Sequence, residues 1–305
     1  MVFSVAVAFS ICGCSQHEGN IYHAIQAGDL DSVEALLESN PDLLNAAGPD
    51  GLTPLHSASL WGKRKVAEFL LAQQANVNAR NEQGRTPLHW ATACDHVALV
   101  ELLLTHGADP RATDHRGRAP LHAVAAVGPT FKPSLGAAEL LLSHGADINA
   151  RDKDEWTALH LAASNSHLEF CGFLIAKGAE CDIYAASALG ELDRVIALLE
   201  KEPDLVMVPD ACGLMPMHWA AARGKSQVVE LLLAGGAAAD PLSNREGWTP
   251  MQRAAANGYT DVVSILLAHG ADANALAQDG RSMLQRANTD GHFEIAKLLV
   301  RYGAK

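Results

Sequence analysis

The sequence predicts an all-α solenoid of about nine helix-turn-helix units, with polar loops connecting them. Three observations support this fold class. One tetrapeptide returns along the 305-residue chain at intervals of about 33 residues. Each copy begins a short apolar segment and is followed by a second one with helical spacing. Glycine ends most of the second segments. A unit of this size has too little interior to fold alone, so each must bury its apolar side against the next.

The tetrapeptide predicts where the first helix of each repeat begins. Its complete form is Thr-Pro-Leu-His, as at Thr53–His56 and Thr86–His89. A threonine hydroxyl can accept a hydrogen bond from the unpaired N–H groups of a helix start, and proline suits the first helical position. Further copies, some of them degenerate, start at Ala119, Thr157, Met215, Thr249 and Ser282.

The second helix of each repeat is predicted by apolar residues at helical spacing, as in 97–104 and 228–233. A glycine just past the last apolar residue can close a helix in the left-handed conformation at little cost. Such glycines stand at Gly107, Gly145, Gly178, Gly236, Gly270 and Gly303.

Two repeats lack the tetrapeptide and align with each other without gaps, at residues 20–43 and 182–205. The chain therefore divides into five repeats over 20–181 and four over 182–305, an arrangement that a duplicated block would give. The opening helix of the second block presents an apolar face, from Ala185 to Leu189, which needs cover. We therefore favour one continuous stack, with a bend near residues 177–183, over two separate domains.

The tetrapeptide, the L-L-x-x-G-A-D-x-N-A run and the repeat period resemble the ankyrin repeat over residues 19–305. The resemblance implies an ankyrin repeat solenoid with connecting β-hairpin loops, in which the stack is L-shaped and the hairpins lie as fingers along one edge. It also implies that the threonine and histidine side chains tie adjoining repeats together. Gln252 and Gln285 depart from the pattern, so we expect the C-terminal repeats to be held less firmly. Structural roles are accordingly predicted for His56, His89, His122, His160 and His218.

The N-terminus resembles a bacterial lipoprotein signal, with residues 1–13 as the signal peptide and 14–19 as a short tether. The resemblance implies lipidation of Cys14 and a periplasm-facing location in the cell envelope. Two features depart from it: no Lys or Arg precedes the apolar run, and Cys12 is unusual two residues before the modified cysteine. The alternative is an uncleaved or miscalled start on a cytoplasmic protein. The run is too short to span a bilayer.

Composition and motif content argue against several function classes. The chain is 49% apolar and carries a net charge of −12, so it should fold and should be repelled by nucleic acid. No catalytic or nucleotide-binding motif occurs, and no domain-sized segment lies outside the repeats. No C-x-x-C pair indicates zinc. We therefore expect no enzyme activity, cofactor or metal. Pairing of Cys181 with Cys212 in an oxidising compartment stays open.

A repeat stack without chemistry of its own is expected to act through its surface, at the hairpin tips and the exposed side of each first helix. Large planar side chains that recur just before the tetrapeptide are typical anchors for partner proteins, although Trp and Arg are common there in ankyrin repeats. An inserted loop carries Phe131 and Lys132, and it could serve function or be neutral drift. By contrast, Trp90 and Trp219 are expected to pack between repeats. The predicted partner-binding residues are Trp61, Arg85, His115, Arg116, Arg118, Phe131, Lys153, Trp156 and Trp248.

These observations favour a non-enzymatic, lipid-anchored monomer that binds a partner protein. A cytosolic ankyrin adaptor and a regulatory or inhibitory subunit of an enzyme are the alternatives. The partner's identity cannot be inferred, because ankyrin repeats have no common ligand.

Overall fold

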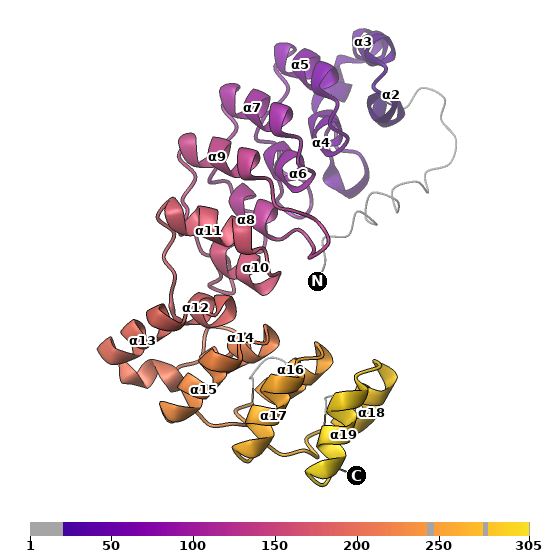
Figure 1. Cartoon of the computed structure of the whole chain (residues 1–305). Helices are drawn as coiled ribbons and strands as arrows, with labels where there is room; N and C mark the ends of the chain where they lie inside the picture. Colours follow the sequence, from indigo (N-terminus) through magenta and orange to yellow (C-terminus); the bar gives the residue numbers. More distant parts are fainter. Residues whose placement is uncertain (1–20, 243–246, 277–279, 305) are drawn as a thin grey trace. The chain divides into compact units, whose positions relative to one another are not determined.

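The computed structural model describes residues 21–242, 247–276 and 280–304, and all extended regular structure in these ranges is helical (Figure 1). The α-helices of these ranges, α2 to α19, form nine pairs, each of them one repeat. The loops between repeats are tight turns, and the described residues contain no β-strand, only an isolated bridge between Leu276 and Ser282. The chain divides into two compact blocks, an N-terminal block that ends at Ala179 and a C-terminal block that begins at Glu180.

The N-terminal block contains repeats 1 to 5. Their helices are α2 (Ile21–Ala27) and α3 (Leu30–Ser39), α4 (Pro54–Leu60) and α5 (Arg64–Ala72), α6 (Pro87–Ala93) and α7 (Val97–Thr105), α8 (Pro120–Ala125) and α9 (Leu135–Ser143), and α10 (Ala158–Ser164) and α11 (Leu168–Ala176). First helices pack on first helices from α2 to α10, and second helices on second helices from α3 to α9 (Figure 1). Between these two rows lies an aliphatic core, in which the tetrapeptide leucines Leu55, Leu88, Leu121 and Leu159 are buried.

The C-terminal block contains repeats 6 to 9 and has the same two rows. Its helices are α12 (Ile183–Leu189) and α13 (Leu192–Lys201), α14 (Pro216–Ala222) and α15 (Ser226–Ala234), α16 (Pro250–Ala256) and α17 (Thr260–Ala268), and α18 (Met283–Thr289) and α19 (Phe293–Arg301). First helices pack on one another from α12 to α18, and second helices from α13 to α19. Met217 and Met251 fill the place of the tetrapeptide leucine and are fully buried.

The two repeats without the tetrapeptide share local structure as well as sequence. A short 3-10 helix follows the second helix in each, η2 (Pro41–Asn45) and η4 (Pro203–Met207), and η3 (Pro49–Gly51) precedes repeat 2. A tyrosine of the first helix then anchors the chain beyond it. The Tyr22 hydroxyl lies 2.9 Å from the Ala46 carbonyl, and the Tyr184 hydroxyl donates to the equivalent Val208 carbonyl at 3.2 Å.

The first helices begin as the tetrapeptide predicts. In repeat 2, the Thr53 backbone N–H donates to His56 Nδ1 at 3.1 Å, and the Thr53 side chain accepts from the His56 N–H. Met215 has no hydroxyl, yet its backbone N–H still donates to His218 Nδ1 at 3.1 Å. The histidine therefore keeps half of the cap when the threonine is absent.

In the repeats that carry the tetrapeptide, the second helix is closed by a residue with positive φ. Gly107 has φ +85°, which costs glycine little. Repeat 2 has Gln74 at this place, with φ +67°, a conformation that crowds a side chain's Cβ. The backbone hydrogen bonds that end the two helices are equivalent. The Ala75 N–H donates to the Leu70 carbonyl, and the Ala108 N–H donates to the Leu103 carbonyl, both at 3.0 Å.

The inserted loop lies between α8 and α9 and ends at Ser134, whose hydroxyl accepts from the Ala137 N–H at 3.2 Å to cap α9. Phe131 is 52% exposed on this loop. Within the described ranges, no helix has the length and apolar character needed to cross a bilayer.

Candidate functional site

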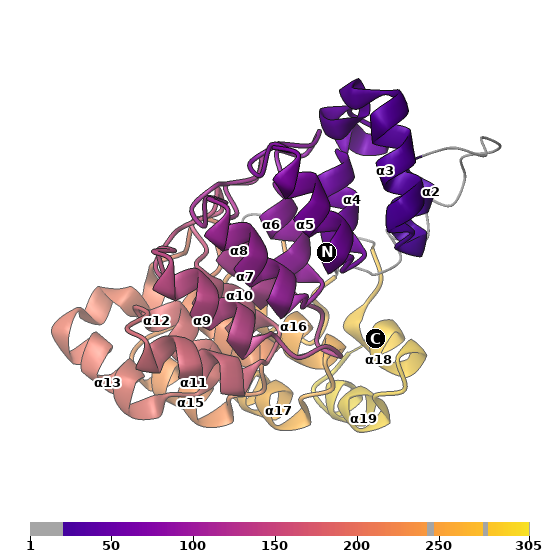
Figure 2. The same ribbon diagram turned by 90° about the horizontal axis from the view of Figure 1, so that it is seen from above.

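Figure 2 shows the loops between the helical pairs of the N-terminal block along one side of that block. Backbone hydrogen bonds join the tips of these loops from repeat to repeat. The Glu82 backbone N–H donates to the Asp50 carbonyl at 3.1 Å, that of His115 to the Gln83 carbonyl at 2.9 Å, and that of Lys153 to the Arg116 carbonyl at 2.9 Å. We call this row of tips, residues 50–52, 81–85, 114–118 and 152–156, the tip edge.

A buried carboxylate shapes each of the last two tips. Asp114 Oδ1 accepts from the backbone N–H groups of Arg116 at 2.8 Å and Arg118 at 3.0 Å. Asp152 Oδ1 accepts in the same way from Asp154 and Trp156, at 2.9 and 3.0 Å. Asn81 provides an amide oxygen for the equivalent bonds in the second tip. A turn closed by a side-chain oxygen is thus built into three successive tips.

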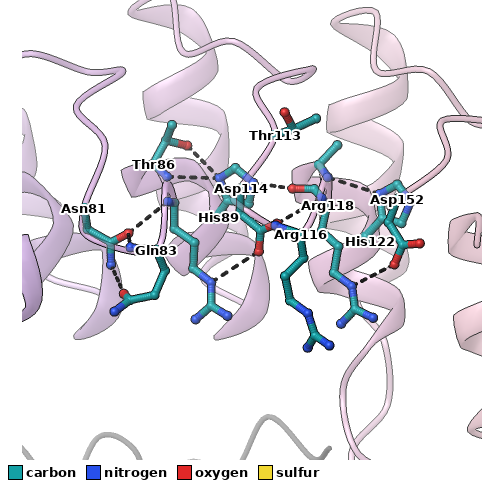
Figure 3. A network of polar contacts seen from close by, with 12 residues as sticks. Asn81, Gln83, Thr86, His89, Thr113, Asp114, Arg116, Arg118, His122 and Asp152 are labelled. Atoms are coloured by element: carbon teal, nitrogen blue, oxygen red, sulfur yellow. Dashed lines mark hydrogen bonds and ion pairs between the residues drawn. The ribbon is translucent and has the colours of Figure 1, made fainter. Parts of the chain in front are cut away.

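The second oxygen of each carboxylate binds an arginine from the preceding tip (Figure 3). Arg85 Nε lies 3.6 Å from Asp114 Oδ2, and Arg118 Nε lies 3.0 Å from Asp152 Oδ2. The arginine side chains remain 20% and 13% exposed. In the first tip, Leu52 occupies the position of these arginines. In the second tip, the neutral Asn81 occupies the position of the aspartate that would pair with it. In the N-terminal block, the carboxylate therefore occurs where the preceding tip carries an arginine.

The tetrapeptide histidines fasten the tips to the first helices. His56 Nε2 lies 2.9 Å from the Arg85 carbonyl, His89 Nε2 2.9 Å from Arg118, and His122 Nε2 3.1 Å from Trp156. Because Nδ1 accepts a backbone N–H in each ring, the proton resides on Nε2, which donates to the next repeat.

Burial keeps these imidazoles neutral. Desolvation lowers the pKa of His56 and His89 to about 4, and it also lowers the pKa of His122. His218 in the C-terminal block has a pKa of about 4 for the same reason, and its Nε2 donates to the Trp248 carbonyl at 3.1 Å. These groups are structural donors at pH 7.

Solvent-facing basic side chains lie along the same edge. His115, Arg116 and Lys153 are exposed, and Figure 3 shows the Arg116 and Arg118 side chains pointing to the same side of the repeats. The side chain of Arg116 makes no hydrogen bond or ion pair with any described residue. This part of the tip edge can therefore present a charged side chain to a partner.

Trp90 contributes an aromatic side chain to the first-helix face beside the tip edge. The Arg85 guanidinium lies 5.5 Å from the centre of the Trp90 ring, a cation–π contact. Trp90 is half-buried and lines a shallow pocket with Arg118 and Ala123, so it contributes to the surface as well as to packing. Trp219 instead is buried, and its indole N–H donates to Asp210 Oδ2 at 3.0 Å.

The structure brings part of the predicted set together. Arg85, His115, Arg116, Arg118, Lys153 and Trp156 share the tip edge. Trp61 directly follows α4, and Phe131 is in the loop between α8 and α9, so both lie where the first helix meets the second rather than at the tips. Trp248 belongs to the C-terminal block, where the Arg286 guanidinium lies 4.8 Å from its ring centre.

Sequence reasoning missed the residues that organise this edge. Asp114 and Asp152 occupy the turn position four residues before Arg118 and Trp156, and each follows a repeat with an arginine before its tetrapeptide. That pairing across one repeat period was the available signal. Within the described part of the chain, no cluster of three or more His, Cys, Asp or Glu side chains could hold a metal ion.

Stacked helical pairs that display charged and aromatic side chains along one edge define a repeat scaffold for macromolecular recognition. The sequence matches the family model for ankyrin repeats (3 copies) over residues 21–114, 106–185, 183–277 and 217–305, and the chain belongs to the ankyrin-repeat family. Ankyrin repeats indicate a protein–protein interaction module. No curated protein matches the sequence.

Proposed function

We propose that this ankyrin-repeat protein is a non-enzymatic binding module that holds a partner protein through the tip edge and the first-helix face of its N-terminal block. The observation that carries the proposal is the ordered row of arginines. Arg85 and Arg118 are fixed by buried carboxylates and remain partly exposed, and Arg116 extends beside them.

Fixed guanidinium groups favour binding because their conformational entropy is already restricted in the free protein. Arginine and tryptophan are also the residue types that most often dominate interface energetics. Trp90 and Trp156 supply half-buried aromatic surface next to these cations. A partner that binds this face contacts charged and apolar side chains that are already ordered in the free protein.

Crosslinking followed by affinity purification from cells tests the proposed face. The test variant combines Arg116→Glu with Lys153→Glu, two exposed side chains whose replacement leaves both buried ion pairs intact. Lys65→Glu, an exposed charge reversal on α5, is the matched control. We expect the double variant to recover at least tenfold less partner than the control. Equal recovery from both refutes the tip edge as the binding face.

We also propose that the chain is anchored to a membrane by a lipid on Cys14 in the bacterial cell envelope. Cys14 and the predicted signal peptide lie outside the described residues, and the support is the resemblance of residues 1–16 to a lipoprotein signal. Several acyl chains on one cysteine would make release slow. Five residues, Ser15 to Gly19, would then separate the lipid from repeat 1.

Labelled palmitate supplied to cells tests the anchor. We expect label in the wild-type chain and none in Cys14→Ser. Label in both proteins, or in neither, contradicts lipidation at Cys14 and favours a cytosolic ankyrin adaptor.

A further inference from the structure

The tip edge carries two pairs of like charges, one acidic and one basic. The backbone hydrogen bond from Glu82 to Asp50 places these two acidic residues side by side in the tips of repeats 2 and 3. The bond from Lys153 to Arg116 does the same for two basic residues in the tips of repeats 4 and 5. All four residues are exposed. The edge is therefore acidic toward repeat 2 and basic toward repeat 5.

None of these four side chains makes a hydrogen bond or ion pair with another described residue. Other charged groups of the edge do have partners within the block, since Arg85 and Arg118 bind buried carboxylates and Glu155 lies 3.9 Å from Arg151. Asp154, at the repeat 5 end, is only partly exposed. Like charges held side by side repel each other. Opposite charges supplied by another molecule would relieve that repulsion at both ends of the edge.

The order of these charges makes the edge complementary to itself. The third backbone bond joins His115 to Gln83, which separate the acidic pair from the basic pair. Four consecutive tips thus present Asp50, Glu82, Arg116 and Lys153 in that order. A two-fold rotation about the middle of the edge brings the acidic end of one copy opposite the basic end of another. Parallel copies would instead bring like charges together.

The repeat fold does not require charges at these positions. The tip of repeat 7 has the same construction, with Asp210 Oδ1 accepting from the Cys212 N–H at 2.9 Å. It carries Ala211 and Cys212 where the tip of repeat 4 has His115 and Arg116. An uncharged tip therefore closes equally well, and the charge order of the N-terminal block calls for an explanation other than folding.

We propose that a second copy of this chain binds the tip edge in antiparallel orientation, acidic end against basic end, and that this pairing competes with the partner protein for the edge. The competition rests on the proposed function. The pairing departs from the monomer that the sequence analysis expects.

Electrostatics set the strength and the orientation of this contact. Exposed ion pairs each contribute little, so we expect a weak dimer that exchanges readily and that a partner can displace. Each chain carries a net charge of −12, which opposes association through most of its surface. Opposite charges meet across the two copies only when the tip edges are antiparallel, and charge complementarity therefore selects this orientation.

Sedimentation equilibrium of the full chain at low ionic strength measures the pairing. The acidic-end variant combines Asp50→Asn with Glu82→Lys, and the basic-end variant combines Arg116→Glu with Lys153→Glu. Asparagine suits position 50 because Asp50 has φ +55°, a conformation that asparagine adopts readily. Lys65→Glu on α5 is the control. We expect the wild type and the control to dimerise at high protein concentration, and each tip-edge variant alone to have a dimer Kd at least tenfold higher.

Mixtures of chains separate the charge order from general repulsion. The acidic-end variant is less negative than the wild type, so general repulsion would strengthen its pairing, whereas loss of complementarity weakens it. The two variants mixed together should pair at least as tightly as the wild type. A fluorescent label on one chain identifies the mixed dimers. Raising the ionic strength to about 1 M, where screening acts over ~3 Å, should weaken the wild-type dimer at least tenfold.

A chain that combines all four substitutions tests the orientation. Its charge order is reversed, so antiparallel pairing predicts that it dimerises with itself and does not pair with the wild type. Parallel pairing predicts the opposite result. Because this chain must regain association that each half loses, its dimerisation also shows that the variants are folded.

Four results overturn the inference: a wild type that stays monomeric at millimolar concentration, variants that dimerise as tightly as the wild type, no association between the two variants, or a dimer that salt strengthens. The proposed function fails separately. If Arg116→Glu/Lys153→Glu loses its partner in cells and the wild type is monomeric, the tip edge stands as the partner site and self-pairing is wrong. If the dimer forms and that variant recovers its partner normally, self-pairing stands and the tip edge is not the partner site.

Discussion

Histidine and glutamine both occupy the last position of the tetrapeptide, and they make different hydrogen bonds there. His89 accepts from its own helix start and donates to the next repeat. Gln252 Oε1 accepts from the Thr249 N–H at 2.8 Å, which retains the cap. Its Nε2 is buried without a hydrogen-bond partner, so the donation to the next repeat is missing. A buried donor left unsatisfied lowers stability.

Gln252→His should therefore stabilise the C-terminal block by about 1 kcal/mol, because the imidazole can supply both bonds. Amide hydrogen exchange of α16 and α17 measures the change, with protection expected to rise roughly fivefold. The conservative variant Gln252→Asn, too short to reach the next repeat, provides the control. Unchanged or lower protection in Gln252→His would show that the missing bond has no energetic consequence.

The same histidines predict acid sensitivity. His56 and His89 have a pKa of about 4 in the folded protein and about 6.5 when unfolded, so the unfolded chain binds more protons between these values. The free energy of unfolding should be independent of these groups above pH 6.5. It should fall as pH decreases toward 4, by up to about 1.4 kcal/mol per pH unit for each histidine.

Urea unfolding between pH 7 and pH 4.5 measures this slope. His89→Gln replaces one titrating group with the residue found at 252, so its slope should be shallower than that of the wild type. Parallel slopes for the two proteins would mean that His89 titrates normally in the folded state.

At the level of the hairpin tip, one carboxylate performs two tasks. Asp152 closes its own turn through Oδ1 and holds Arg118 through Oδ2. Asp152→Asn keeps the turn, as Asn81 does in its tip, and removes the charge. Asp152→Ala removes both. We expect Asp152→Ala to cost about 1–2 kcal/mol more than Asp152→Asn, because two further backbone donors lose their acceptor.

Exchange protection of α10 reports the cost of each substitution. Equal losses in the two variants would assign the whole effect to the ion pair. A larger loss in Asp152→Asn would contradict the role of the turn.

The end of a second helix gives a further test at this level. Gln74 adopts φ +67°, where repeats 3 to 5 have glycine. Gln74→Gly should stabilise repeat 2 by about 1 kcal/mol, since left-handed backbone costs a residue with Cβ roughly that much. Gly107→Ala should destabilise repeat 3 by a similar amount. Its Cβ would meet no atom within 4 Å, so the cost would come from the backbone alone. Exchange protection of α5 and α7 measures both, and changes of the same sign would refute the argument.

For the whole molecule, the local signals in the sequence predicted the helices well. Caps and closing residues act within a few positions, so the tetrapeptide and glycines locate both helices of most repeats. The carboxylates that pair with Arg85 and Arg118 could not be predicted from these local signals. Arg118 and Asp152 are 34 residues apart, and their contact depends on how one repeat sits on the next. The partial exposure of Trp90 follows from the same packing. Which of the predicted surface residues contact a partner stays a prediction.

The central claim is that the protein acts by presenting the tip edge to another protein. Site-specific photocrosslinking from whole cells tests it most directly, with benzoylphenylalanine placed at Arg116 or at Lys65 in otherwise wild-type chains. We predict a discrete crosslinked product from position 116 and none from position 65, which lies on α5 away from the tips. A product from position 65 alone, or equal products from both positions, would contradict the claim.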